Sequence, residues 1–97
     1  MNLKIHPITD FIITPHAAFE MQRRSLTAEM VQSVLAKPEQ RLAVRTGRIV
    51  LQSRIAMGLP ERVYLVRIFV DVDRVPAEIV TVYRTSKIEK YWNEEES

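Results

Sequence analysis

The sequence contains no cysteine, which excludes a disulfide framework, a thiolate zinc site and a cysteine nucleophile. It has only two glycines, and no glycine-rich loop that could cradle phosphates, which argues against a nucleoside-triphosphate enzyme. No apolar run approaches the roughly 18 residues of a membrane span, and the N-terminus has no apolar signal core. We therefore expect a cytoplasmic protein that does not contact a membrane.

The remaining composition is that of one folded domain. The chain has 97 residues, of which 46% are hydrophobic and 27% charged, as in ordinary soluble globular proteins. Compact domains usually have about 100–150 residues. We expect a single domain over residues 1–97, with a core over about 14–92 and an acidic tail over 93–97.

Arginine supplies most of the positive charge. Fourteen basic and twelve acidic residues give a net charge of +2. From Glu89 onward four glutamates and one lysine contribute −3, so residues 1–88 carry +5. Ten of the fourteen bases are arginine, whose guanidinium matches phosphate geometry. This bias favours an anionic partner such as RNA or DNA, and the alternative is a solvated surface that is rich in arginine.

Two helices are predicted near the N-terminus. Thr14 is placed as an N-cap before Pro15 at the first helical position, and this helix runs to about Arg24. Thr27 caps a second helix, which Pro38 ends. The second helix carries an apolar stripe at helical spacing, made by Met30, Val31, Val34 and Leu35.

From Arg41 the apolar period changes from 3.6 to 2. This pattern predicts strands over residues 41–45, 48–57, 62–72 and 78–84, followed by a short terminal helix within 86–93. The short connections favour antiparallel neighbours. The predicted fold class is α+β, with two N-terminal helices packed on a four-stranded antiparallel sheet in near-sequential strand order.

Strand alternation sorts the side chains into two faces of this sheet. Alternation in the last strand puts Ile79 on the same side as Thr81. If the apolar sets meet the helices, the other face collects arginines, an amide, hydroxyls and a phenol. These polar residues are Arg48, Gln52, Arg54, Arg67, Thr81, Tyr83 and Thr85. Such a face suits an anionic ligand.

His16 is the candidate base. It falls at the second position of the first helix, where the positive end of the helix dipole disfavours a protonated imidazole. A neutral histidine can accept a proton as a general base. Glu20 and Arg23 share its stripe at 100° per residue. The competing interpretation is a surface histidine beside a solvated ion pair.

Metal-free RNA cleavage also needs a cation for the developing phosphate charge and a proton donor for the leaving oxygen. Arg48, Arg54 and Arg67 are candidates for the cation. Tyr83 is a candidate for the donor or for a ring that stacks on a base.

Two other pairs leave alternatives open. Asp71 and Asp73 point the same way in a strand, but without a third ligand a polar strand end is the simpler interpretation. We predict no metal and no cofactor. Tyr91 and Trp92 are either an anchor for a partner or the docking point of the last turn on the domain.

The chain resembles a bacterial domain family of unknown function that is related to the BrnT and RelE toxins. Its opening "HA-x-x-R-M-x-x-R-x-I-s" is similar to His16-Ala17-Ala18-Phe19-Glu20-Met21-Gln22-Arg23-Arg24-Ser25-Leu26-Thr27. Its continuation "V-x-x-V-L-x-x-P-E" is matched by Val31, Val34, Leu35, Pro38 and Glu39, and its last strand resembles residues 80–87. The likeness covers about residues 14–92, and Glu20 takes the place of the usual arginine.

This resemblance implies the α+β fold shared by RelE, barnase-like and EndoU-like ribonucleases, and a bacterial or phage origin. It also implies a metal-independent ribonuclease toxin held by an antitoxin protein. We therefore predict His16, Arg67 and Tyr83 as catalytic residues. The residues predicted to contact RNA are Arg23, Arg48, Gln52, Arg54, Thr81, Thr85 and Lys87. The alternative is a non-catalytic module of the same fold that binds RNA or a protein.

Overall fold

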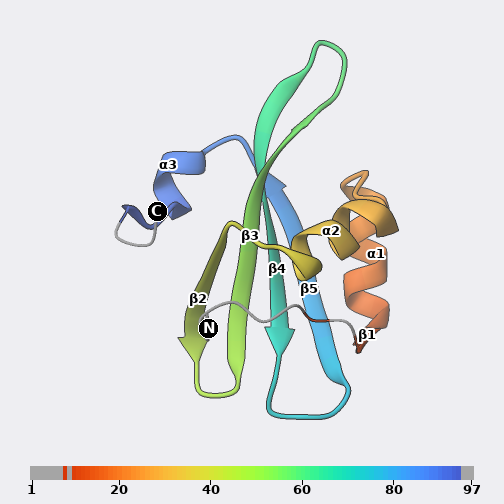
Figure 1. The fold of residues 1–97 in the computed structure, drawn as a ribbon. Coiled ribbons are helices and arrows are strands. Elements are labelled where there is room, and N and C mark those ends of the chain that lie inside the picture. The colour runs from red at the N-terminus through yellow and green to blue at the C-terminus, as the bar shows by residue number, and fades with distance from the viewer. Residues whose placement is uncertain (1–7, 9, 95–97) are drawn as a thin grey trace.

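A computed structural model describes residue 8 and residues 10–94 of the chain. These residues form three helices and five strands (Figure 1). In chain order the elements are β1 (Phe11–Ile13), α1 (Pro15–Arg23), α2 (Ala28–Ala36), β2 (Gln40–Arg45), β3 (Arg48–Met57), β4 (Arg62–Asp71), β5 (Ala77–Thr85) and α3 (Ile88–Tyr91). The predicted α+β class is confirmed.

The strands form one mixed sheet in the order β1-β5-β4-β3-β2. Strands β2 to β5 make the predicted antiparallel meander. Strand β1 pairs parallel with β5, so the prediction of a purely antiparallel sheet of four strands is wrong. A strand of three residues is too short to show an alternating pattern, and its partner lies at the other end of the chain.

Both N-terminal helices begin at the predicted caps. The hydroxyl of Thr14 accepts a hydrogen bond from the Ala17 amide at 3.1 Å, and that of Thr27 accepts one from the Met30 amide at 3.1 Å. Each cap satisfies one of the backbone N–H groups that a helix start leaves without a partner. Helix α2 crosses one face of the sheet, while α1 packs along β5 (Figure 1).

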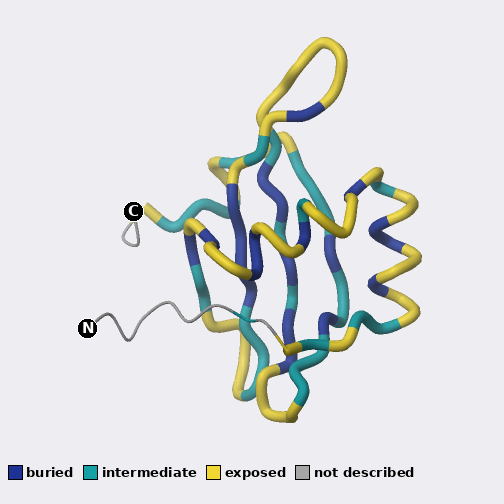
Figure 2. Tube along the Cα trace, turned by 45° about the vertical axis from the view of Figure 1, so that its right-hand side comes forward, coloured by how far each residue is buried: buried dark blue, intermediate teal, exposed yellow. Residues whose placement is uncertain are grey.

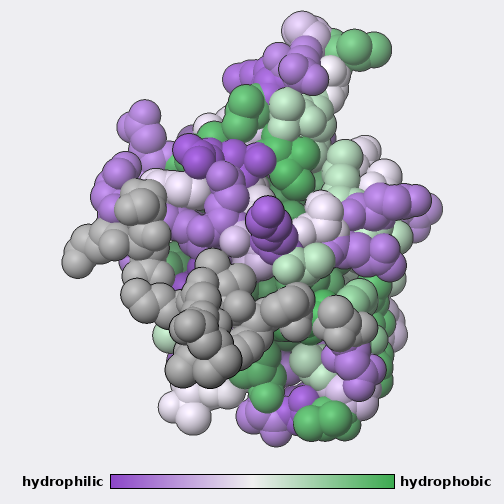
Figure 3. Space-filling view, in the orientation of Figure 1, coloured by the Kyte–Doolittle hydropathy of each residue, from purple (hydrophilic) through white to green (hydrophobic). Residues whose placement is uncertain are grey.

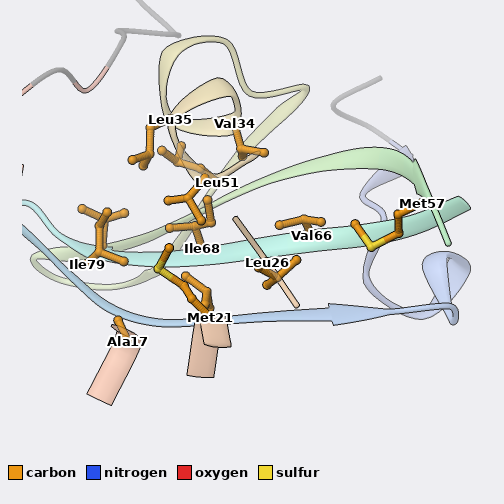
Figure 4. Packing of buried hydrophobic residues seen from close by; sticks show 13 residues of the cluster. Ala17, Met21, Leu26, Val34, Leu35, Leu51, Met57, Val66, Ile68 and Ile79 are labelled. Atoms are coloured by element: carbon orange, nitrogen blue, oxygen red, sulfur yellow. The ribbon is translucent and has the colours of Figure 1, made fainter. Parts of the chain in front are cut away.

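The core lies between the two helices and the sheet (Figure 4). Ala17 and Met21 enter it from α1, and Val31, Val34 and Leu35 enter it from α2. The sheet contributes Leu51, Met57, Val66, Ile68, Val70, Ile79 and Val82. Full burial of each such large side chain contributes about 1.5–3 kcal/mol of transfer free energy. The apolar contacts on this side of the sheet therefore determine how the helices pack on it.

The predicted faces hold for β3 and β4 but not for all of β5. A bulge shifts the register so that Phe69 pairs with Thr81 whereas Val70 pairs with Ile79. Ile79 is therefore fully buried in the core instead of lying beside Thr81 on the opposite face. One extra residue reverses the side on which every residue before it points, and strict alternation cannot show where that residue falls.

The hairpin of β3 and β4 extends beyond the rest of the sheet. Its ladder continues to the pair Met57–Arg62, whereas β5 joins β4 only from Leu65 onward. The tip is exposed (Figure 2) and carries hydrophobic residues (Figure 3), among them the fully exposed Leu59. Within the part of the chain that the structure describes, no helix is long and apolar enough to cross a membrane.

Candidate functional site

The sheet face opposite α2 carries a row of four polar side chains, one from each antiparallel strand. Gln40 pairs with Gln52, Gln52 with Arg67, and Arg67 with Tyr83 across β2, β3, β4 and β5. We call these four residues the polar row. Gln52 donates to the side-chain oxygen of Gln40 at 2.8 Å, and Arg67 donates from Nε to that of Gln52 at 2.8 Å and from Nη1 to the Tyr83 hydroxyl. The row is thus continuous.

The segment around α3 covers the glutamine end of the polar row. Gln52 donates to the Tyr91 carbonyl at 3.1 Å, and Gln40 both donates to the Asn93 carbonyl and accepts from its amide, at 2.6 and 3.1 Å. Both glutamines are almost fully buried, so these bonds satisfy groups that would otherwise be costly to bury. Of the two interpretations of Tyr91 and Trp92, the structure shows docking onto the domain.

Arg67 keeps its charge without an acidic partner. Its guanidinium carbon lies 4.4, 5.3 and 5.6 Å from the ring centroids of Tyr91, Phe69 and Tyr83. Among the described residues no carboxylate lies within ion-pair distance, and no acceptor contacts Nη2. Aromatic faces attract a cation without neutralising it, so the charge of Arg67 has no carboxylate counterion among the described residues.

Helix α1 adds an imidazole and a second guanidinium at the tyrosine end of the row. Nε2 of the exposed His16 lies 3.5 Å from the Thr81 hydroxyl, which is on β5 two residues before Tyr83. The guanidinium of Arg24 lies 5.8 Å from the centroid of the Tyr83 ring. The structure therefore brings two predicted catalytic residues, Arg67 and Tyr83, into contact, and it places the third, His16, beside Thr81, two residues before Tyr83 on β5.

Glu20 organises the arginines of α1. Its Oε1 accepts a hydrogen bond from Nε of Arg24 at 2.8 Å, and Nε of Arg23 lies 3.5 Å from Oε2. The hydrogen bond from Arg24 lowers the pKa of Glu20 against the opposing effect of burial. A carboxylate with a lowered pKa is a poor general base, so Glu20 positions cations and His16 is the base candidate on this helix.

Arg24 is the residue of this cluster that the sequence prediction missed. The prediction grouped His16 and Glu20 with Arg23, whereas the contact with the Tyr83 ring is made by Arg24. The signal was present, because positions 16, 20 and 24 repeat at four-residue spacing along one side of a helix.

Two predicted phosphate ligands are paired with carboxylates. Nε and Nη2 of Arg48 both donate to the buried carboxylate of Asp71, and this lowers the pKa of Asp71. Arg54 donates to Glu39 at 2.9 and 3.1 Å, which lowers the pKa of Glu39, and it stacks at 4.1 Å on the Trp92 ring. Both arginines lie on the predicted face, but their charges are paired with carboxylates, whereas Arg23 and Arg24 share the single carboxylate of Glu20 and together keep a net positive charge.

The remaining predicted contacts lie at the exit of β5. The Thr85 hydroxyl accepts a hydrogen bond from the Lys87 amide at 3.0 Å, in the turn that leads to α3. Residues 86–90 line an open hollow there, and no member of the polar row lines it. Among the described residues no three acidic or histidine side chains are grouped as a metal site would require.

Comparisons with protein-family models, with curated proteins and with solved structures found no match. The resemblance to the BrnT and RelE toxins thus stays a prediction. The case for function depends on the geometry of the polar row and α1.

Proposed function

We propose that the protein is a toxin-like, metal-independent endoribonuclease of the RelE/BrnT type, which acts in the cytoplasm. Its site is the Tyr83 end of the polar row, where α1 packs on β5. One observation carries the proposal: Arg67 is hydrogen-bonded to Tyr83, and the segment of α1 brings the guanidinium of Arg24 against the Tyr83 ring and His16 against the neighbouring Thr81. These groups can supply the base, the acid and the cations of RNA cleavage.

The reaction is a transesterification within the RNA. Neutral His16 takes the proton of a ribose 2′-hydroxyl, whose oxygen attacks the adjacent phosphorus. The bond from phosphorus to the 5′-oxygen breaks, and that oxygen takes the hydroxyl proton of Tyr83. The products are a 2′,3′-cyclic phosphate and a 5′-hydroxyl, and proton exchange with water restores both side chains.

The contacts of Tyr83 and Arg67 suit these roles. The Tyr83 oxygen accepts a hydrogen bond from Arg67, so its own hydrogen is free to be donated. Nη2 of Arg67 faces no acceptor among the described residues, and a phosphate oxygen can take that place. Arg24 and Arg67 would stabilise the charge that develops on the phosphate, the largest effect in many reactions of this kind.

A toxin of this type would be held by an antitoxin protein. The corresponding test is expression in a bacterial host, where the chain should arrest growth and the product of an adjacent small gene should relieve the arrest. This partner is proposed from the resemblance alone.

One observation favours a second candidate, a non-catalytic module that binds RNA or a protein. Arg67 donates to two neutral side chains and packs among three aromatic rings, which is also how a structural arginine is held. In that case Arg67 and Tyr83 fix the sheet face, and the cations of α1 bind the ligand.

The test is incubation of the purified protein with single-stranded RNA in excess chelator, with identification of the product ends. A 2′,3′-cyclic phosphate supports the ribonuclease. Binding without cleavage, with or without added metal and also on ribosome-bound RNA, supports the module instead.

A further inference from the structure

Phe19 is an aromatic side chain that the core does not use. It lies in the middle of α1 and is 61% exposed, whereas its neighbours Ala17 and Met21 are buried. A phenyl ring that is more than half exposed forgoes much of the hydrophobic stabilisation that its burial would give. Packing within the domain therefore does not account for phenylalanine at this position.

The position of Phe19 relates it to the candidate site. It follows His16 by three residues and precedes Arg23 by four, so the three side chains occupy adjoining stripes on the exposed side of α1. His16 contacts Thr81 at the end of the polar row. The Arg23 side chain is 54% exposed even though it lies near Glu20. The Phe19 ring thus lies on the exposed side of α1, next to the His16 end of the candidate site.

We propose that Phe19 stacks on a base of single-stranded RNA while Arg23 contacts an adjoining phosphate. This inference rests on the proposed function. It identifies Phe19 as a residue that contacts the RNA next to the groups that carry out the cleavage. A ring beside a cation matches a ligand in which bases and phosphates alternate. Its exposed helix neighbours Ala18 and Gln22 offer no large apolar surface of the kind that a protein interface core has.

Stacking has a signature that separates it from charge. Aromatic stacking is lost when the ring is replaced by alanine, and it tolerates any base, because every base has an aromatic face. An oligomer with the same phosphates but no bases retains the electrostatic attraction and loses the stacking. The ratio of the two affinities therefore reports the contact with the ring.

The experiment measures binding of a 2′-O-methyl RNA oligomer, which cannot undergo the transesterification, and of an abasic oligomer of the same length. We expect Phe19→Ala to weaken binding of the base-bearing oligomer about tenfold and to leave that of the abasic oligomer unchanged. Phe19→Trp should retain the wild-type affinity. Gln22→Ala, an exposed change on the same helix, is the matched control. Thermal melting verifies that each variant folds, and Phe19→Gln replaces the alanine variant if that one does not.

Three outcomes would overturn the inference: an equal loss for both oligomers, no loss while the wild type binds, or a wild type that binds neither oligomer. Cleavage is measured separately on unmodified RNA, so a protein that binds through Phe19 but never cleaves would contradict only the proposed ribonuclease.

Discussion

Arg67 on β4 donates a hydrogen bond from Nη1 to the hydroxyl oxygen of Tyr83, the residue directly opposite it on β5. Side chains opposite each other on one face of an antiparallel pair lie about 5 Å apart at their Cβ atoms. The sheet register itself therefore places a cation beside a phenol. Nε of the same guanidinium donates to the side-chain oxygen of Gln52 on β3. Hydrogen bonds to both neighbouring strands thus fix the orientation of the guanidinium plane.

The first prediction separates the Tyr83 hydroxyl from its ring. Tyr83→Phe keeps the stacking with Phe69 and removes the proton donor. We expect RNA cleavage to fall about a hundredfold, the scale of a lost general acid, while RNA affinity stays near the wild-type value. Single-turnover cleavage and fluorescence anisotropy measure the two effects. Unchanged cleavage would mean that another group protonates the leaving oxygen.

The second prediction compares two exposed arginines. Each phosphate contact with a single strand contributes about 0.7 to the slope of log affinity against log salt concentration. Arg23→Ala should reduce that slope by about this amount. Arg54→Ala should leave it unchanged, because Glu39 pairs with Arg54 one to one, whereas Glu20 is shared by Arg23 and Arg24. The opposite pattern would move the phosphate site to the face near Trp92.

The third prediction concerns the buried glutamines. Gln52→Ala removes the partner of Gln40, of the Tyr91 carbonyl and of Arg67 at once. Because unsatisfied buried polar groups are costly, we expect a loss of about 2–4 kcal/mol in the free energy of unfolding. Urea denaturation measures it. Gln32→Ala, an exposed change in α2, is the control, and equal stability of the two variants would argue against the polar row as a structural unit.

The fourth prediction is a loss of stability in acid. Hydrogen bonds from Arg24 and Arg48 lower the pKa values of Glu20 and Asp71 in the folded protein from ordinary values of 4.5 and 3.8. Around and below these pKa values the folded state therefore binds fewer protons than the unfolded chain. The two carboxylates contribute their full stabilisation above the ordinary pKa values, and that contribution is lost as the pH falls through the lowered pKa values.

Thermal melting between neutral pH and about pH 3 measures this loss. In Asp71→Asn the fall should be smaller, because one of the titrating groups is gone. A melting temperature that is constant over this range would contradict the ion pairs.

The repetitive part of the fold could be predicted from the sequence. The two caps, the apolar stripe of α2 and the alternation of β3 and β4 are local signals, and the structure agrees with them. Strand β1 and the bulge in β5 could not be predicted, since each depends on which residue pairs with which across the sheet. Ile79 changed faces for that reason alone.

The candidate site shows the same division. Alternation correctly placed Gln52, Arg67 and Tyr83 on one face, but it could not show that Arg48 and Arg54 would be paired with carboxylates. Those partners come from other strands or from the loop before β2, and only the folded sheet brings them into contact. The position of His16 beside β5 likewise follows from how α1 packs.

The most direct test of the central claim is the rate at which His16→Ala cleaves single-stranded RNA in excess chelator, relative to the wild type. We expect the wild type to produce a 2′,3′-cyclic phosphate, and we expect the variant to be slower by about a hundredfold or more. The variant should melt at nearly the wild-type temperature, since His16 is exposed. A His16→Ala protein that cleaves as fast as the wild type would contradict this assignment of the base, and a wild type that leaves RNA intact would contradict the ribonuclease.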